Sequence, residues 1–300
     1  MAGMQTKWDT YLEEQIKKYK GICVPLKAGM LERIFVKKLR CTSMHPNPAD
    51  EFCHADIGPS YRIIGEYEKS IRKNLLHGLD PFDEPIMVEK MHPDGYLILN
   101  GHHRWAAAFR CDIKKVAVKI VNLTQETDIE KVLQNSKHDR RASFDLDEVV
   151  FGGSDPKLLE KPLPITKRHF YKERLTLGIP AIFHFLAMHG YDIWLYTSSY
   201  YSYDYLQHLF RLYHVHVDGV ITGMKRKVED TAENRKAQEH IKQMFRDSYK
   251  ETIAIDKYML LRTISGQDEY EHYEIPEKAE DWSREVINRL EEIEKGRKHE

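Results

Sequence analysis

The sequence has few cysteines, no long apolar run and almost no net charge. Its four cysteines, in a chain of 300 residues, do not indicate a disulfide framework. No segment is apolar over the roughly 18 residues that a membrane span needs, and the N-terminus lacks the apolar core of a signal peptide. The 46 basic residues balance 47 acidic ones, so no global field attracts nucleic acid, although a local basic patch stays possible. We therefore expect a cytoplasmic protein without a membrane partner.

The length and composition predict two ordinary globular domains. Three hundred residues are more than one hydrophobic core usually holds, while 41% apolar and 31% charged residues are typical of globular chains. A polar, charged stretch from 122 to 141 separates the two halves, so we place the boundary near residue 135. Residues 1–135 form the first predicted domain. Residues 136–300 form the second, which ends in an amphipathic helix after Pro276.

Two carboxylates one residue apart are the first chemical signal. Asp145 and Asp147 lie in 143–151, a run that otherwise has the composition of a strand. Alternate side chains of a strand share one face, so both carboxylates are expected to point the same way. Two like charges held this close are costly unless a cation lies between them, and Mg²⁺ usually takes such a place. Alone, the pair is better explained as a turn with two solvated acids, but the later chain favours the metal.

Polar residues also follow the later predicted strands. They are Thr197 after 191–196, Lys225 and Lys227 after 216–222, and Asp256 after 252–255. Helices are predicted between these strands, and strands that alternate with helices form parallel sheets. Ligands of such sheets bind beyond the carboxyl ends of the strands, which is where all of these residues are expected.

In this order, the residues resemble the motifs of the haloacid dehalogenase (HAD) superfamily, over roughly residues 141–262. The resemblance implies a Rossmann-like parallel sheet, with Asp145 as the nucleophile that forms an aspartyl-phosphate and Asp147 as the general acid and base. It also implies the remaining roles: phosphoryl binding for Thr197, charge neutralisation for Lys225 or Lys227, and Mg²⁺ binding for Asp145, Asp147 and Asp256.

Two features limit what the HAD resemblance implies. Asp256 is followed by Lys257, whose charge would repel a metal, and no further acid appears until Asp268. A degenerate domain without catalysis is therefore an open alternative. Only 52 positions separate Asp145 from Thr197, which leaves no room for a large cap. The site should be open, so that it accepts bulky phosphorylated substrates or is closed by a neighbouring domain.

The first half carries a second signal at the end of a predicted hairpin. Strands at 85–90 and 96–99 flank the turn Pro93-Asp94-Gly95, and an alanine-rich helix follows from His102 without a loop. The start of that helix exposes unpaired backbone N–H groups beside two histidines and Arg104, whose guanidinium suits phosphate. The pattern predicts an anion site, and a tight turn with exposed histidines is the alternative.

Residues 85–121, with Asn47-Pro48 upstream, resemble the ParB/sulfiredoxin fold, a small α+β domain. In that family a Gly-x-x-Arg loop binds nucleotide phosphates, which implies phosphate contacts for Gly101, His102, His103 and Arg104. His102 stands where sulfiredoxins carry their reactive cysteine, so sulfinic-acid repair is not expected. The double histidine is more similar to the loop of the free-serine kinases than to that of the partition CTPases. Glu51 is the nearest acid for the catalytic glutamate of the kinase branch.

Together, these observations predict an α/β protein of two domains, a ParB/sulfiredoxin-like domain followed by a HAD-like domain without a large cap. The first hypothesis is a Mg²⁺-dependent phosphohydrolase whose N-terminal domain binds ATP, ADP or CTP. The second is a kinase of small, serine-like alcohols in the N-terminal domain, and the third is a nucleotide-gated binding protein without turnover. The expected partner is a phosphorylated small molecule or a nucleotide, whereas nucleic acid is unsupported by the net charge. The oligomeric state is left open.

Overall fold

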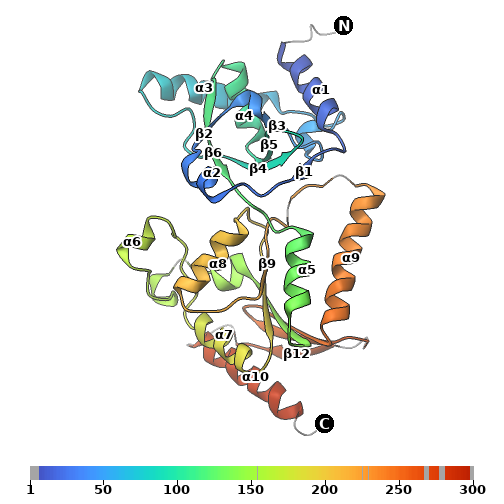
Figure 1. Ribbon diagram of the computed structural model, residues 1–300. Coiled ribbons are helices and arrows are strands. Elements are labelled where there is room, and N and C mark those ends of the chain that lie inside the picture. Colours follow the sequence, from blue (N-terminus) through green and yellow to red (C-terminus); the bar gives the residue numbers. More distant parts are fainter. Residues whose placement is uncertain are drawn as a thin grey trace. The chain divides into compact units, whose positions relative to one another are not determined.

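The computed structural model describes residues 7–153, 155–224, 226–228, 230–266, 270–276 and 281–297. It is a mixed α/β protein with two sheets, one in each half of the chain (Figure 1). The contacts divide the chain into two compact units. Unit 1 comprises Met1–Asn122 and Arg226–Arg235, and unit 2 comprises Leu123–Lys225 and Lys236–Glu300. No helix in the described ranges is long and apolar enough to cross a membrane.

The two units divide at a different point from the predicted boundary near residue 135. The change falls after Asn122, so helix α5 (Glu126–Asn135) is part of unit 2. Ile129 of α5 is buried in one cluster with Trp194 and Phe245 of the same unit. The segment Arg226–Arg235, although it lies late in the chain, is grouped with unit 1, which the sequence did not suggest.

Unit 1 is built on one six-stranded sheet. Its helices are α1 (Lys7–Tyr19), α2 (Met30–Phe35), α3 (Tyr61–Leu76) and α4 (His102–Arg110), with short turns at Cys41–Ser43 and Glu51–Cys53. Its strands are β1 (Val24–Pro25), β2 (Lys38–Arg40), β3 (Met44–His45), β4 (Ile86–His92), β5 (Tyr96–Asn100) and β6 (Lys115–Ile120). The sheet runs β2-β6-β4-β5-β3, and β1 pairs with the end of β4.

The predicted hairpin and helix of unit 1 are confirmed. Strands β4 and β5 pair antiparallel around Gly95, whose φ of +75° suits the turn. The chain then passes through Gly101, whose φ of +104° favours glycine, directly into α4. Trp105 and three alanines of α4 are fully buried, because small side chains let the helix pack closely. This packing fixes the start of α4 directly beyond the end of β5.

Unit 2 is built on a second six-stranded sheet. Besides α5, its helices are α6 (Ile165–Arg168), α7 (Ile179–Met188), α8 (Tyr203–Leu212), most of α9 (Ala232–Ser248) and α10 (Trp282–Arg297). Its strands are β7 (Arg140–Asp145), β8 (Asp192–Tyr196), β9 (Gly219–Ile221), β10 (Glu251–Ile255), β11 (Met259–Ile264) and β12 (Tyr270–Glu274). The sheet runs β12-β11-β10-β7-β8-β9. The four strands from β10 to β9 are parallel, as predicted, and β11 and β12 add antiparallel strands at one side.

The sheet of unit 2 is covered on both faces. Alternate residues of a strand point to opposite faces, so Leu195 and Trp194 of β8 belong to different clusters. Leu195 and Phe144 pack with side chains of α7, α8 and α10. Trp194 packs with Ile129 of α5 and Phe245 of α9, two helices that lie side by side in Figure 1. Helices on both faces are the usual surroundings of a parallel sheet.

The strand predicted over 143–151 is wrong beyond Asp145. Strand β7 ends at Asp145, and Leu146–Val150 form a π-helical turn. The turn buries its three apolar side chains, which strand alternation would have sent to both faces. The Asp145 carboxylate accepts the backbone N–H of Glu148 at 2.7 Å and so caps the turn. Asp145 and Asp147 therefore do not share a strand face.

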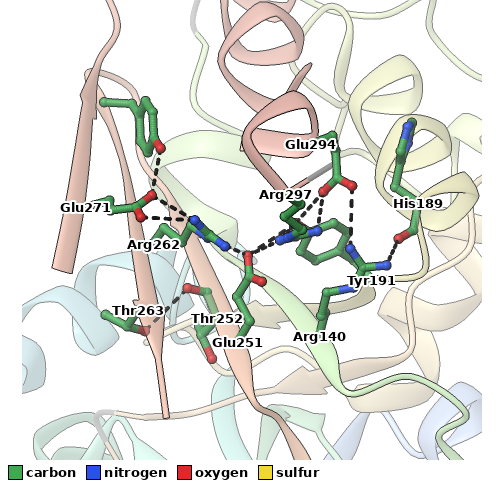
Figure 2. Close-up of polar contacts among 11 residues, drawn as sticks. Arg140, His189, Tyr191, Glu251, Thr252, Arg262, Thr263, Glu271, Glu294 and Arg297 are labelled. Atoms are coloured by element: carbon green, nitrogen blue, oxygen red, sulfur yellow. Dashed lines mark hydrogen bonds and ion pairs between the residues drawn. The ribbon is translucent and has the colours of Figure 1, made fainter. Parts of the chain in front are cut away.

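A buried ionic network joins the strands of unit 2 to α10 (Figure 2). Glu251, at the start of β10, accepts hydrogen bonds from Arg262 Nε at 3.0 Å and from Arg297 of α10. Arg262 also donates two bonds of 3.0 Å to Glu271 of β12, and Arg297 donates to the Tyr191 hydroxyl at 2.6 Å. Glu251 and Arg262 are each only 7% exposed. Loss of Glu251 would therefore remove the carboxylate that Arg262 and Arg297 share and leave each arginine with one carboxylate, Glu271 or Glu294.

We predict that Glu251→Gln lowers the free energy of unfolding by about 1.5–3 kcal/mol, because it removes the charged hydrogen bonds that Arg262 and Arg297 make to one shared carboxylate. Glu292→Gln is the control, because Glu292 pairs with Arg289 on an exposed helix face and should cost at most about 1 kcal/mol. Urea unfolding followed by tryptophan fluorescence measures both. Equal losses in the two variants would contradict the importance of the network.

Candidate functional site

The carboxyl edge of the parallel strands gathers residues that the sequence predicts as a site. Asp145, the last residue of β7, pairs in register with Tyr196 of β8, so Thr197 follows directly beyond it. On the other side, the parallel register with β10 puts Asp256 level with Asp145. Neighbouring strands lie about 4.8 Å apart. The register therefore places Asp145, Thr197 and Asp256 at one edge, with Asp145 on the middle strand of the three.

Asp147 is held by the residues that follow β8. Its Oδ2 accepts hydrogen bonds from Thr197 Oγ1 at 2.7 Å and from Ser198 Oγ at 3.5 Å. Thr197 is fully buried, and its Oγ1 also accepts the N–H of Ser199 at 2.9 Å. Thr197 thus orients the Asp147 carboxylate, a contact that the sequence does not indicate. Its contact with a phosphoryl group stays a prediction.

The aspartate oxygens suit Mg²⁺ by type, but the three predicted ligands are not gathered at one point. Mg²⁺ prefers carboxylate oxygens and often takes only one or two from the protein. A search of the described part of the chain for three metal-capable side chains with ligand atoms within 4.8 Å of one another finds Glu126, Glu130 and His240. It does not find Asp145, Asp147 and Asp256 together. All three carboxylates accept hydrogen bonds, Asp145 from the Glu148 N–H, Asp147 from Thr197 and Asp256 from the Lys257 N–H. Asp147 is half-buried, whereas Asp145 and Asp256 are exposed. Asp145 and Asp256 are therefore the residues that would hold the ion.

Of the two predicted site lysines, only Lys227 lies among the described residues. Lys225 lies outside the described residues. Lys227 is grouped with unit 1, where its Nζ pairs with Asp50 at 3.5 Å and with Glu51 at 3.3 Å. In the structure, Lys227 therefore neutralises carboxylates of unit 1.

Lys257 directly follows Asp256, and from the sequence we expected only that its charge would repel a metal. Its N–H donates to the carboxylate of Asp256, and its carbonyl accepts from Trp282 Nε1 at 2.8 Å. A methyl group added at Gly152 would meet Lys257 Cε at 3.2 Å. Lys257 thus lies against the loop that follows Asp145 and its turn.

In unit 1, a cavity of about 410 Å³ lies at the start of α4. It is lined by the predicted loop, from Gly101 to Arg104, together with Asp50, Asn100 and side chains of α3. A volume of this size suits a small ligand. The start of a helix adds unpaired backbone N–H groups and a partial positive charge, which favour an anion there.

Both histidines of this loop accept backbone N–H groups. His102 Nε2 accepts from Asn47 at 3.1 Å, and His103 Nε2 accepts from Ser60 at 3.2 Å. An accepting nitrogen carries no proton, so the proton of each neutral ring is on Nδ1. His102 Nδ1 lies 4.0 Å from the Asp50 carboxylate. The alternative of exposed histidines is wrong for His102, which is 6% exposed.

Arg104 is buried where it can organise the loop. Its Nη1 donates to the Glu84 carbonyl at 2.9 Å, and its Nη2 donates to Asn100 Oδ1 at 3.2 Å. The Glu84 carboxylate lies 3.3 Å from Nη1. A side chain at Gly101 would crowd the guanidinium, since an added methyl would lie 3.2 Å from Arg104 Nε. Gly101 therefore serves both the turn and the close approach of Arg104.

Asp50 is the cavity residue that sequence reasoning missed. It accepts the N–H of Phe52 at 3.0 Å and lies between His102 and Lys227. The loop is also tied to the late segment of unit 1, because Asn47 Nδ2 donates to the Lys227 carbonyl at 3.0 Å. Glu51, the acid that the sequence favoured, is exposed and pairs with Lys227. The Asn47-Pro48 pair indicated this loop in the sequence. The contact of Asn47 with Lys227 joins positions 180 residues apart, so no local sequence pattern predicts it.

Burial and charge shift the acid–base properties of this cluster. Burial lowers the pKa of His102 to about 4, although the nearby Asp50 carboxylate opposes the change. Burial also lowers the pKa of His103. Burial acts to raise the pKa of Asp50, but His102, the Phe52 N–H and Lys227 together bring it below its ordinary value. His102 is therefore neutral and Asp50 is ionised at neutral pH.

The neutral state of His102 predicts a loss of stability in mild acid. Its pKa is 6.5 in the unfolded chain and about 4 in the folded protein, so the unfolded chain binds more protons between these values. The free energy of unfolding should therefore decrease as the pH falls from about 6.5 towards 4. His102→Asn should lose less stability than the unsubstituted protein between pH 7 and pH 5 in urea unfolding. His77→Asn, at an exposed position, is the control, and equal losses in all three proteins would contradict the prediction.

Comparisons with known proteins bear on unit 1. Residues 30–137 match the ParB N-terminal domain family, which confirms the ParB-like region. The match runs from α2 through α5 and includes the Gly101 loop; it ends at residue 137, before β7. No curated protein and no solved structure matches the chain.

Proposed function

We propose that the protein hydrolyses a phosphomonoester at the carboxyl edge of the unit 2 sheet, with Mg²⁺, and binds a nucleotide at the Gly101 loop of unit 1. The observation that carries the first part is the register of β7 with β8 and β10. It supports the proposal because Asp145, Thr197 and Asp256 follow three neighbouring parallel strands, in the order that the HAD resemblance requires. Ligands of parallel sheets bind at this edge.

The proposed reaction has two steps. Asp145 attacks the phosphorus, the bond to the leaving oxygen breaks, and Asp147 gives that oxygen a proton. Asp147 then takes a proton from a water molecule that attacks phosphorus, which frees inorganic phosphate and restores Asp145. The 2.7 Å bond from Thr197 supports this role for Asp147, because it fixes the carboxylate next to the attacking residue.

Positive charge completes the proposed site. When bound, Mg²⁺ would stabilise the negative charge that develops on the phosphoryl oxygens, and Asp145 and Asp256 are the side chains that would hold it. Lys257, against the loop after Asp145, adds a cation to this edge and supports the binding of a phosphate. Lys227 is engaged with Asp50 and Glu51, so we assign it no part in this reaction.

The nucleotide part of the proposal rests on the cavity of unit 1. The family match covers the cavity loop, and in the ParB/sulfiredoxin fold this loop binds phosphates. The start of α4 and the guanidinium of Arg104 are suited to such a group. Gly101, His102 and His103 complete the lining, with ATP, ADP and CTP as candidate ligands.

Asp50 favours a kinase of small alcohols as the second candidate function. It is a carboxylate that lines the cavity, next to the loop proposed to hold the phosphates. Its pKa is lowered, so it is ionised and able to accept the proton of an alcohol that attacks a terminal phosphate. Transfer of labelled phosphate from ATP to serine-like alcohols, lost in Asp50→Asn, would support this function in place of hydrolysis.

We predict that Asp145→Asn lowers Mg²⁺-dependent release of phosphate from p-nitrophenyl phosphate by on the order of 10³-fold or more, because an amide does not form the acyl phosphate. Asp147→Asn should cost about 10²–10⁴-fold, the usual contribution of an acid–base group. Glu148→Gln is the matched control, since Glu148 is an exposed acid in the same turn. A loss in all three variants, or no Mg²⁺-dependent turnover in the unsubstituted protein, would defeat the hydrolase proposal.

Nucleotide binding is tested separately at Arg104. We predict that Arg104→Lys weakens binding of ATP or CTP by about tenfold or more in isothermal titration, because lysine cannot keep the two contacts, to Glu84 and Asn100, that hold the loop in place. Arg62→Lys, on the exposed face of α3, is the control and should leave binding unchanged. Unchanged affinity in Arg104→Lys would remove the Gly101 loop as the nucleotide site.

A further inference from the structure

Unit 1 contains a second and larger cavity, of about 1090 Å³. It lies at the end of α4, near Phe109 and Arg110, whereas the Gly101 loop lies at the start of the same helix. Helix α4 has nine residues and so spans about 13 Å between the two cavities. The lining comes from α1, β2, α3, α4 and the start of β6.

Positive charge dominates this larger cavity. Its lining has six basic side chains and two acidic ones, Glu68 and Asp112. The basic side chains are Lys7, Arg40, Arg72, Arg110, Lys114 and Lys115. The protein as a whole carries a net charge of only −1, so this concentration of charge is a local feature.

Most of these cations have no carboxylate to balance them. Glu68 pairs with Arg110 at 2.5 Å and with Arg72 at 3.7 Å, so one acid serves two arginines. Within the described ranges, the other four basic side chains make no ion pair. Arg40 and Lys115 are cross-strand partners on β2 and β6, and Lys114 directly precedes Lys115. Like charges in such a cluster repel each other, and an anionic ligand would relieve the repulsion.

The floor of the cavity is apolar and already packed. Trp8 is 3% exposed and lies edge-on to Trp105, with ring centroids 5.1 Å apart. Phe109 stacks on Tyr11 at 4.4 Å. Trp8 is therefore not available for stacking, and the half-buried Phe109 already stacks on Tyr11, so the lining offers little ring surface to a nucleic-acid base.

We propose that this cavity binds a small ligand that carries several phosphate groups, such as a short phosphate chain. Six cations around a cavity of this volume match several closely spaced negative charges, and arginine forks suit phosphate oxygens. The small ring surface left on Phe109, the one partly exposed aromatic residue among the described lining residues, favours such a ligand over single-stranded nucleic acid. The proposal does not depend on the hydrolase site or on the Gly101 loop.

Titration of the full chain with inorganic tripolyphosphate tests the proposal. Isothermal titration should show binding that is at least about tenfold weaker in Lys114→Gln/Lys115→Gln, because two of the six cations are removed. Lys119→Gln is the matched control: Lys119 is an exposed lysine on the same strand and does not line the cavity. Higher salt should weaken binding to the unsubstituted protein, since exposed charges are screened.

Two further titrations, one with another variant and one with another ligand, identify the site and the ligand. The titration is repeated in Arg104→Lys, which weakens any phosphate binding at the Gly101 loop; the tripolyphosphate binding that depends on Lys114 and Lys115 should persist there, because Arg104 lines the other cavity. If Arg104→Lys abolishes binding and the double variant does not, the ligand occupies the Gly101 loop and the proposal fails. Tighter binding of a single-stranded oligonucleotide than of tripolyphosphate, lost in the double variant, would overturn it in favour of a nucleic-acid surface. Equal binding by the unsubstituted protein and the double variant would also overturn it.

Discussion

The position of β7 between two parallel strands is the constraint on which the proposed site of unit 2 depends. Strands β8 and β10 run beside β7 in the same direction, so the residues that follow all three strands meet at one edge. The sheet holds this register because Phe144, Leu195 and their neighbours fill one face while Trp194 fills the other. A slip of one residue would exchange the faces and move Asp145 out of line with Asp256.

Unit 1 uses a related arrangement on an antiparallel hairpin. Strand β5 passes through Gly101 directly into α4, so the backbone N–H groups at the start of the helix lie beside the strand end. The buried alanines hold the helix in place, and Arg104 ties the loop to Asn100 and Glu84. In both units, a strand end anchored by a packed core carries the polar groups.

The sequence was sufficient for features that local patterns encode. Alternation and turn residues predicted the β4–β5 hairpin, and apolar strands alternating with helices predicted the parallel sheet. The sequence was insufficient where a short apolar segment is compatible with both a strand and a helical turn. The apolar residues after Asp145 suit a strand, but burying all of them requires a helical turn. It also could not predict contacts between distant positions, such as Lys227 with Asp50 or Thr197 with Asp147. The HAD resemblance implied that Lys225 or Lys227 neutralises phosphate, whereas the structure pairs Lys227 with Asp50 and Glu51.

The account of unit 2 requires that Asp145 itself becomes covalently attached to phosphorus. Mass spectrometry of the protein, quenched in acid during turnover of p-nitrophenyl phosphate with Mg²⁺, tests this directly. The account predicts one added phosphoryl group on the peptide that contains Asp145, and none in Asp145→Asn. Turnover without a covalent intermediate, or with the phosphoryl group on another residue, would contradict it.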